Sequence, residues 1–352
     1  MGLLTNVSAA AAAHLVARDR DGRMVFTCVV KTEHTWRPDG RVDPVAPAPV
    51  RAQDALDTDA PDAAPAVSHP AELGPRKARL DVLLVGTMLT RSPVEAIDAT
   101  LTVGSRLRKT LRVFGDRAWV RGVRGDFQPT RPRPFTHMPI AWGRAFGGVD
   151  PANPAQAELR NPAGVGMISD VRAVAGTRLP NFEDPRDPIT SPKSRPVPAG
   201  FGAIAAHWLP RARLAGTFDQ RWSDSRRPLL PEDFDPLFYN VAPADQQLDG
   251  FVAGEEVRLT NLTQSGYDRF LLPDTAVPII FVTDKAVIHT RAVVDTVLID
   301  PEQRRLSVIS RAQLVPEPSP LSLRNVIVGE PSRGLRRAIA TGKRHVGRAP
   351  QS

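Results

Sequence analysis

Apolar and polar residues alternate most regularly between Phe26 and Trp36, in the segment FTCVVKTEHTW. A period of two sends successive side chains to opposite faces of an extended chain, so the pattern predicts a β-strand. Asp21-Gly22 before the segment and Pro38-Asp39-Gly40 after it are turn signals. The N-terminal third is therefore expected to form a hairpin or a meander.

Further strand-like runs continue along the chain. Leu80–Leu89 is apolar on both faces, as a buried strand should be, and Gly104-Ser105 separates two runs like a hairpin turn. The other predicted strands are Asp98–Val103, Leu107–Val113, Ala118–Val120, Glu255–Leu262, Ala276–Thr283, Val293–Asp300 and Leu306–Ser310. Because no helical period separates them, we expect a mainly β protein with antiparallel sheets, sandwich-like or barrel-like, and few short helices.

Two segments interrupt this pattern. Val42–Ala71 is rich in Ala, Pro and Asp, and it is interpreted as a mobile or loosely attached loop. Pro129–Pro243 alternates short apolar pieces with prolines, but it also carries most of the aromatic residues. Since aromatic side chains bury large areas and anchor irregular chain, this segment is expected to be an ordered, Pro- and Gly-rich loop layer on the sheets.

The stretch from Pro139 to Gly166 is rich in residues that break regular secondary structure, with five glycines and four prolines. Glycine allows left-handed backbone angles, and proline removes a hydrogen-bond donor, so neither a helix nor a central strand fits here. A long shaped loop remains. Such a loop either binds a partner or only braces the core, and the residues alone leave both possibilities open.

The length of 352 residues suggests about two domains. We expect one β-rich domain over residues 1–315, with two packed subdomains, about 1–128 and 129–315, as the alternative. Residues 316–352 are expected to be a basic tail, which includes a short helix from Ser332 to Thr341 with Ser332 as its N-cap. A solvated tail is favoured over a docking element, although Lys343, Arg344 and Arg348 add to its positive charge.

The net charge is +8, and only six of the 46 basic residues are lysine. The arginines are spread along the chain, as a GC-rich genome would produce, so nucleic-acid binding is not favoured. A lone cysteine, Cys28, excludes an intrachain disulfide and fits a reducing compartment. It lies in an apolar strand, which favours a buried structural thiol over a nucleophile. Without a secretory signal or an apolar run of membrane-spanning length, we expect a soluble, cytoplasmic protein.

No motif for a metal, nucleotide or other cofactor is present, because the seven histidines are scattered and no phosphate-binding glycine loop occurs. Asp233 and Asp235 follow Pro231 and could serve as the acid and base of a hydrolase or a carbohydrate-active enzyme. They could equally cap a short helix, and proline just before them favours that interpretation.

Several motifs, taken in order, resemble the bacterial family known as domain of unknown function 2169. The resemblance covers about Leu4 to Arg311. The matching pieces are Gly115-Asp116-Arg117 with Trp119, Pro134–Gly148 (PFTHMPIAWGRAFGG), Asn161–Gly166 (NPAGVG), Leu179–Pro185 (LPNFEDP), Pro198–Ile204 (PAGFGAI), Trp208 with Pro210-Arg211, Gly216–Trp222 (GTFDQRW), Arg227–Gln247 (RPLLPEDFDPLFYNVAPADQQ), Gly254–Glu256 and Val294-Asp295-Thr296.

The resemblance implies a setting more than a reaction. Members are similar to proteins encoded beside VgrG and PAAR spike proteins and toxins of type VI secretion. It implies an adaptor or chaperone that binds a toxin effector, or its PAAR-bearing carrier, for loading onto the spike. The family often has an acidic residue where this chain has Gly143, so a carboxylate role at that position is not carried over.

A partner-binding surface built from the central loops would draw on arginine and aromatic residues, which are typical interface anchors. The candidate protein-binding residues are Arg144, Phe146, Gly147, Gly148, Asn161, Trp222, Asp233, Asp235 and Phe238. Internal packing is the alternative for the aromatic residues, and Arg144 could instead bind loop carbonyls that Pro and Gly leave unpaired.

Overall fold

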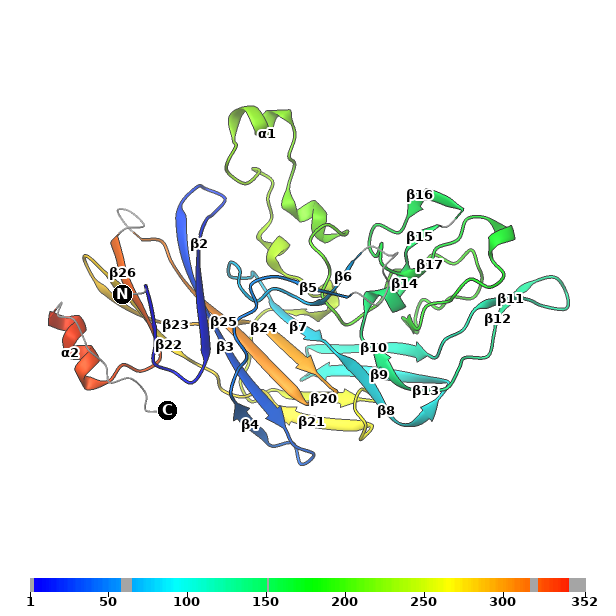
Figure 1. Cartoon of the computed structure of the whole chain (residues 1–352), viewed down its shortest axis with the longest axis horizontal. Helices are drawn as coiled ribbons and strands as arrows, with labels where there is room; N and C mark the ends of the chain where they lie inside the picture. Colours follow the sequence, from blue (N-terminus) through cyan, green and yellow to red (C-terminus); the bar gives the residue numbers. More distant parts are fainter. Residues whose placement is uncertain (1–2, 58–64, 151, 317–321, 342–352) are drawn as a thin grey trace.

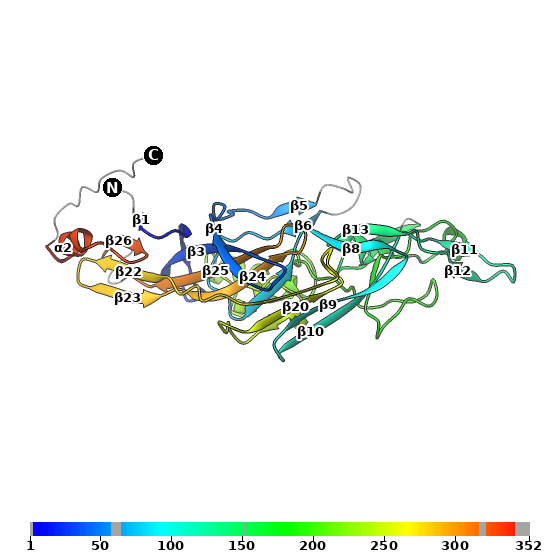
Figure 2. The same ribbon diagram turned by 90° about the horizontal axis from the view of Figure 1, so that it is seen from below.

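The computed structural model describes residues 3–57, 65–150, 152–316 and 322–341. The expected mainly β architecture with several antiparallel sheets is confirmed. A four-stranded sheet lies at one end of the elongated molecule, a seven-stranded sheet lies in the middle, and a five-stranded sheet lies with much of the loop layer at the other end (Figure 1). The view turned by 90° shows that the molecule is thin along the viewing direction of Figure 1 (Figure 2).

The middle sheet has the strand order β19-β7-β24-β25-β3-β2, and β4 pairs with the far end of β3. Its pairings are antiparallel apart from the parallel pair β7–β24. Its strands are β2 (Ala11–Arg18), β3 (Met24–Trp36), β4 (Val42–Val45), β7 (Leu80–Leu84), β19 (Gln247–Leu248), β24 (Val293–Asp300) and β25 (Arg305–Leu314). The turn signals on either side of β3 join it to β2 and β4, which confirms the predicted meander.

The alternation along β3 supplies two separate hydrophobic cores. Phe26, Cys28 and Val30 face the four-stranded sheet, whereas Val29 belongs to the larger core on the opposite face. Each face of the middle sheet therefore carries a hydrophobic core. Burial raises the pKa of the Cys28 thiol to about 12, so it stays protonated and is a structural residue, as the strand pattern indicated.

The five-stranded sheet is antiparallel throughout, with the order β18-β10-β9-β20-β21. Its strands are β9 (Ala96–Val103), β10 (Leu107–Phe114), β18 (Phe182–Glu183), β20 (Glu256–Thr260) and β21 (Tyr267–Leu271). The predicted hairpin turns at Gly104, which has a φ of +51°. Trp36 of β3 stacks on Phe270 at a centroid distance of 4.6 Å and donates its indole N–H to Asp268 at 2.9 Å, which joins the two sheets.

The four-stranded sheet has the order β1-β26-β22-β23. Its strands are β1 (Leu4–Asn6), β22 (Pro278–Thr283), β23 (Val287–Arg291) and β26 (Leu323–Val328). Strand β26 is an inner, buried strand, so this part of the expected basic tail belongs to the folded body instead. The predicted helix follows as α2 (Arg333–Thr341), and the Ser332 hydroxyl caps it by accepting the Leu335 N–H at 3.2 Å. Lys343, Arg344 and Arg348 lie outside the described residues.

Two sequence predictions need correction. Val42–Ala71 is not a loose loop in its described part, because it contains β4, β5 (Ala55–Asp57) and β6 (Ala66–His69), and Ala66 and Val67 are buried in the main core. Short strands among Ala and Pro give too little alternation to detect. Leu80–Leu89 is not one strand, because Gly86 adopts a φ of +79° and turns the chain from β7 into β8 (Thr87–Val94) of another sheet.

Residues 129–243 form the expected ordered layer of loops, short strand pairs and single helical turns. The remaining strands are β11 (Trp119–Arg121), β12 (Phe127–Pro129), β13 (Phe135–Pro139), β14 (Phe146–Gly147), β15 (Val149–Asp150), β16 (Asn153–Ala157) and β17 (Val165–Gly166). The remaining helical segments are α1 (Gln220–Ser225), η1 (Trp142–Arg144), η2 (Val171–Ala173), η3 (Arg211–Ala215), η4 (Pro236–Tyr239) and η5 (Ala244–Gln246). Within the described ranges, none of the helices is long and apolar enough to cross a bilayer.

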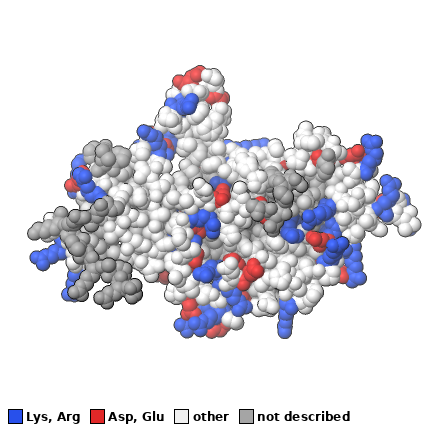
Figure 3. Space-filling model, viewed as in Figure 1, with Lys and Arg blue, Asp and Glu red and all other residues white. Residues whose placement is uncertain are grey.

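Basic and acidic side chains are intermixed over the face seen in Figure 3, where Lys and Arg lie beside Asp and Glu at many points. Many of the arginines are bound to carboxylates. Arg106, for example, pairs with Glu255, and Arg112 pairs with Asp98. Ion pairs thus neutralise many of the arginines, and the basic groups seen in Figure 3 do not form one continuous stripe.

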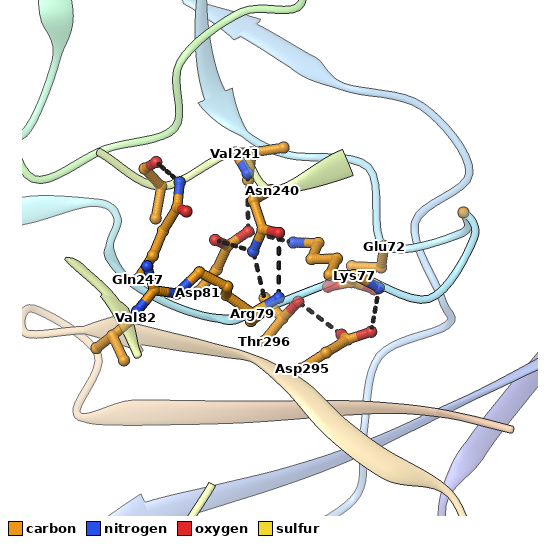
Figure 4. A network of polar contacts seen from close by, with 12 residues as sticks. Glu72, Lys77, Arg79, Asp81, Val82, Asn240, Val241, Gln247, Asp295 and Thr296 are labelled. Carbon is orange, nitrogen blue, oxygen red and sulfur yellow. Dashed lines mark hydrogen bonds and ion pairs between the residues drawn. The ribbon is translucent and has the colours of Figure 1, made fainter. Parts of the chain in front are cut away.

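A buried polar network attaches the loop layer to the middle sheet (Figure 4). The Asp81 carboxylate on β7 has no solvent exposure, and it accepts hydrogen bonds from the Lys77 ammonium at 2.7 Å and the Asn240 side-chain amide at 2.9 Å. The Val241 N–H donates to the same carboxylate at 2.8 Å. Beside it, Asp295 accepts from the Lys77 N–H at 3.1 Å. A buried charge of this kind persists only because every oxygen has a donor.

We expect Asp81→Ala to lower the free energy of unfolding by about 3–5 kcal/mol, because it leaves the buried Lys77 ammonium without its carboxylate. Chemical denaturation monitored by tryptophan fluorescence measures the change. Asp249→Ala is the matched control, since it removes an exposed ion pair with Arg79 and should cost less than about 1 kcal/mol. Equal losses in the two variants would contradict this account of the network.

Candidate protein-binding site

The nine candidate residues separate into two groups according to the elements that carry them. Arg144, Phe146, Gly147, Gly148 and Asn161 come together around the short parallel pair of β14 and β17. Trp222, Asp233, Asp235 and Phe238 lie in and below a segment that carries α1 away from the body. We call residues 216–231 the arm, and the first group of residues the glycine knot.

Asn161 holds the glycine knot together from inside. Its side chain is fully buried, and its amide donates to the carbonyls of Trp142 and Phe146, both at 2.9 Å. The Asn161 backbone carbonyl accepts the Gly148 N–H at 2.9 Å. The Asn161 side chain thus supplies a donor to the Phe146 carbonyl and a second donor to the Trp142 carbonyl, which also accepts the Ala145 N–H at 3.0 Å. Such side-chain donors are a usual requirement for irregular buried chain.

Positions 147 and 148 require glycine because the neighbouring backbone leaves no space for a side chain. Gly147 has a φ of +149° and Gly148 a φ of +88°, angles that side chains rarely adopt. A Cβ on Gly147 would lie 2.2 Å from the Asn161 carbonyl oxygen, and one on Gly148 would lie 2.3 Å from that of Gly164. Phe146 is only 2% exposed, so its side chain packs inside the protein and is not available at the surface. For Phe146, the burial favours the alternative of internal packing over a role as an interface anchor.

Arg144 connects the glycine knot to neighbouring loops. Its guanidinium donates to the Asn181 side-chain oxygen at 3.2 Å and lies 3.6 Å from the Asp116 carboxylate. Asn181 in turn donates to Asp116 at 3.1 Å and to the Phe114 carbonyl at 3.0 Å. The sequence alternative named loop carbonyls as the partners of Arg144. The structure shows a side-chain amide and a carboxylate instead.

The arm begins and ends at one clamp. The Asp233 carboxylate accepts the Thr217 N–H at 2.9 Å and the Thr217 hydroxyl at 2.7 Å, which holds the two sides of the arm together. At the tip, Asp219 caps α1 by accepting the Trp222 N–H at 2.8 Å. The arm is therefore a closed loop with its own internal bonds, and Figure 1 shows it projecting from the body.

Asp233 and Asp235 have separate structural partners. The backbone N–H of Thr217, followed by its hydroxyl, holds the pKa of Asp233 below its ordinary value. Asp235 caps η4 by accepting the Leu237 N–H at 2.8 Å. Among the residues that the structure describes, no three His, Cys, Asp or Glu side chains form a cluster able to hold a metal ion. The geometry favours the capping interpretation over an acid–base pair.

The arm presents an aromatic surface. Phe218 is 55% exposed, and its ring contacts Trp222 edge-on at a centroid distance of 4.8 Å. The Trp222 indole N–H donates to the Leu229 carbonyl at 2.8 Å, which fixes the ring under Phe218. At the base, Phe238 packs against Phe234 at 5.8 Å and under the Arg211 guanidinium at 5.1 Å. Trp222 thus supports Phe218, the exposed residue of this surface, whereas Phe238 packs within the base of the arm.

Sequence reasoning did not single out Phe218. A signal was present, because Phe218 sits between Thr217 and the N-cap Asp219, at the start of a short polar helix with no other large apolar residue than Trp222. An aromatic residue in such a position has few neighbours in the sequence to cover it. Its exposure nevertheless depends on the arm standing clear of the body, which local sequence does not specify.

A cleft of about 620 Å³ lies where several of the quoted motifs meet, between β10 and the loop layer. Its wall includes Trp142, Arg160, Pro198 and Pro210. At its base, the Lys109 ammonium donates to Asp245 at 2.9 Å and to the Gln246 side-chain oxygen at 2.8 Å, while burial lowers the pKa of Lys109. Both bonds connect the sheet to η5, so the lysine has a bracing role.

The fold and these surfaces define a mainly antiparallel β protein whose ordered loops carry a projecting arm with an exposed aromatic residue. The model of the bacterial family described as "Uncharacterized protein conserved in bacteria (DUF2169)" matches residues 21–311, so the chain belongs to this family. No curated protein and no solved structure matches the chain.

Gly147→Ala should destabilise the protein by about 2 kcal/mol, because the new methyl group overlaps the Asn161 carbonyl at an unfavourable φ. Gly74→Ala is the control, since no atom lies within 4 Å of its added Cβ, and it should change stability by less than about 0.5 kcal/mol. Thermal unfolding of both variants distinguishes the outcomes. A Gly147→Ala protein as stable as the control would show that the glycine knot is not tightly packed.

The clamp at the base of the arm should depend on pH. A folded-state pKa below the unfolded value gives stability that is present above the unfolded pKa and is lost as the pH falls through the folded pKa. Protonation of Asp233, which takes place below the ordinary pKa of an aspartate, should therefore release Thr217. Titration of the Thr217 amide resonance by NMR, carried from neutral pH down until the Asp233 carboxylate is protonated, follows this release. The same titration in Asp233→Asn, where it should be absent, provides the comparison.

Proposed function

We propose that this protein is an adaptor or chaperone of type VI secretion that binds a toxin effector, or its PAAR-bearing carrier, in the cytoplasm and loads it onto the VgrG spike. The observation that carries the binding role is the projecting arm with Phe218 exposed on a fixed Trp222. Exposed aromatic side chains on a braced support are typical anchors of protein interfaces.

The construction of the arm supports a binding role for a thermodynamic reason. Association orders loops and side chains, and this ordering costs free energy that the contacts must offset. Here the Thr217–Asp233 clamp, the Asp219 cap and the Trp222 N–H bond already order the arm in the free protein. An aromatic anchor that is held in advance therefore retains more of its burial energy when it contacts a partner.

The secretion setting has a different basis from the binding role. It depends on the resemblance of the quoted motifs to the family, and the match of the family model supports membership without specifying partners. A pull-down of the tagged protein from its native bacterium, with the secretion system active, tests the setting directly. Recovery of a PAAR or VgrG protein together with a toxin supports the proposal, and recovery of none of them contradicts it.

Phe218→Ala should weaken capture of the partner at least about tenfold, because the variant removes a central aromatic contact. The change should leave the free energy of unfolding within about 0.5 kcal/mol of the parent, since Phe218 is mostly exposed. Tyr267→Ala is the matched control, because Tyr267 is also about half exposed (50%) but lies on β21 of the five-stranded sheet. Quantitative pull-down and thermal unfolding of both variants measure the two effects. Equal capture by both variants would remove the arm from the interface.

A further inference from the structure

A groove of about 450 Å³ lies between the middle sheet and the base of the arm. Val25 and Thr27 on β3 line it, as does Gln313 on β25, which pairs with Thr27. These residues continue the row that includes Val29, which the main core covers. The loop layer does not close fully over this end of the sheet, because Val25 is partly exposed and Gln313 is exposed, whereas Thr27 is buried. We call this hollow, with its rim at the β2–β3 turn, the hairpin groove.

The wall opposite the sheet comes from the segment that leads out of the arm. Leu230, Phe234, Pro236 and Tyr239 line this side of the hairpin groove. Phe234 is nearly buried, and its ring lies 5.4 Å from that of Tyr239, so the two form a packed wall. The hairpin groove thus has an apolar interior built from fixed aromatic and aliphatic groups, which is typical of a preformed binding site.

The rim has an excess of positive charge. Arg18, Arg20, Arg23 and Arg76 line the hairpin groove, whereas Asp19 and Asp21 are the acidic residues of its lining. Arg23 pairs with both aspartates, at 2.8 Å and 3.4 Å. Within the described part of the chain, Arg18 and Arg76 form no ion pair, although Arg18 donates to the Gly22 carbonyl at 3.1 Å. Two guanidinium groups therefore lack a counter-charge beside an apolar hollow.

The hairpin groove and the arm form one continuous structure. The Arg226 guanidinium in the arm donates to the Arg20 carbonyl at 2.8 Å and to the Leu230 carbonyl. The Leu229 side chain also lies against Gly22 at the turn between β2 and β3. A partner that contacts Phe218 on the arm can therefore extend a segment toward the hairpin groove without leaving the surface.

We propose that the hairpin groove binds a segment of the partner protein in which a large apolar side chain is flanked by aspartate or glutamate. The apolar walls accept the side chain, and Arg18 and Arg76 pair with the carboxylates. Complementary charge at a rim adds specificity and speeds association more than it adds affinity. This inference rests on the proposed function, because it names the chemistry of the segment that an adaptor would recognise.

Selection of a random dodecapeptide library on phage against the immobilised full-length protein tests the proposal. The enriched sequences should carry acidic residues beside an aromatic or branched apolar residue. A fluorescein-labelled copy of an enriched peptide should bind about tenfold more weakly to the Arg18→Ser, Arg76→Ser variant, measured by fluorescence polarisation. The matched control is Arg91→Ser, Arg124→Ser, which removes the same charge from two exposed arginines elsewhere.

A second variant checks the position of the peptide. Val315 lines the hairpin groove and is 37% exposed, so Val315→Glu places a carboxylate in it without disturbing a fully buried site. It should weaken binding of the acidic peptide at least as much as loss of the two arginines. Thermal unfolding of each variant confirms that it stays folded.

Three outcomes overturn the proposal. One is enrichment of neutral or basic peptides, or of none. Another is peptide binding that the groove variants leave unchanged. The third is a dimer of the free protein, seen by light scattering, that Val315→Glu dissociates, because the groove would then bind a second copy of the chain. Since the selection uses no secretion protein, it can fail while Phe218-dependent capture of a PAAR, VgrG or toxin protein succeeds, so the two proposals fail separately.

Discussion

The position of the arm depends on a carboxylate that solvent never reaches. Asp81 binds Asn240 and the Val241 N–H directly behind η4, and so fixes the loop layer on β7. Asp235 then caps η4, and two residues earlier Asp233 clamps Thr217 at the foot of the arm. In each of these contacts, a carboxylate accepts hydrogen bonds from backbone or side-chain amide N–H groups. A buried ion pair thereby orients an exposed aromatic residue that lies well outside the core.

The quoted motifs have mostly structural roles in this protein. Asn161 and the glycines beside it allow loop backbones to approach closely, and Arg144 ties that knot to Asn181. Such residues are constrained because replacement creates an overlap or an unpaired buried group. Of the residues proposed to contact partners, Phe218 lies within the quoted motif Gly216–Trp222 but on the projecting arm, and Arg76 lies outside the quoted motifs. The rigidly packed loops and the residues proposed to contact partners therefore belong to one connected structure.

The proposed contact surface combines two kinds of interaction. On the arm, Phe218 offers apolar area on a support that is already ordered, which favours affinity. At the hairpin groove, the unpaired charges of Arg18 and Arg76 favour a particular class of segment. The two elements are joined by the Arg226 contacts, so neither can move freely relative to the other. An adaptor that accepts one cargo and rejects others needs both properties.

The sequence by itself determined the elements with a strong local signal. The alternation along β3, the hairpin at Gly104 and the Ser332 cap were all predicted, because period, turn chemistry and capping act within a few residues. Capping by Asp235 was predicted for the same reason. It is the contact within the candidate site that local sequence indicated. Only the tertiary structure decided that Phe146 is buried and Phe218 exposed, and that Leu323–Val328 is an inner strand. Those outcomes depend on which distant segments cover a side chain, and that information is not contained in local spacing.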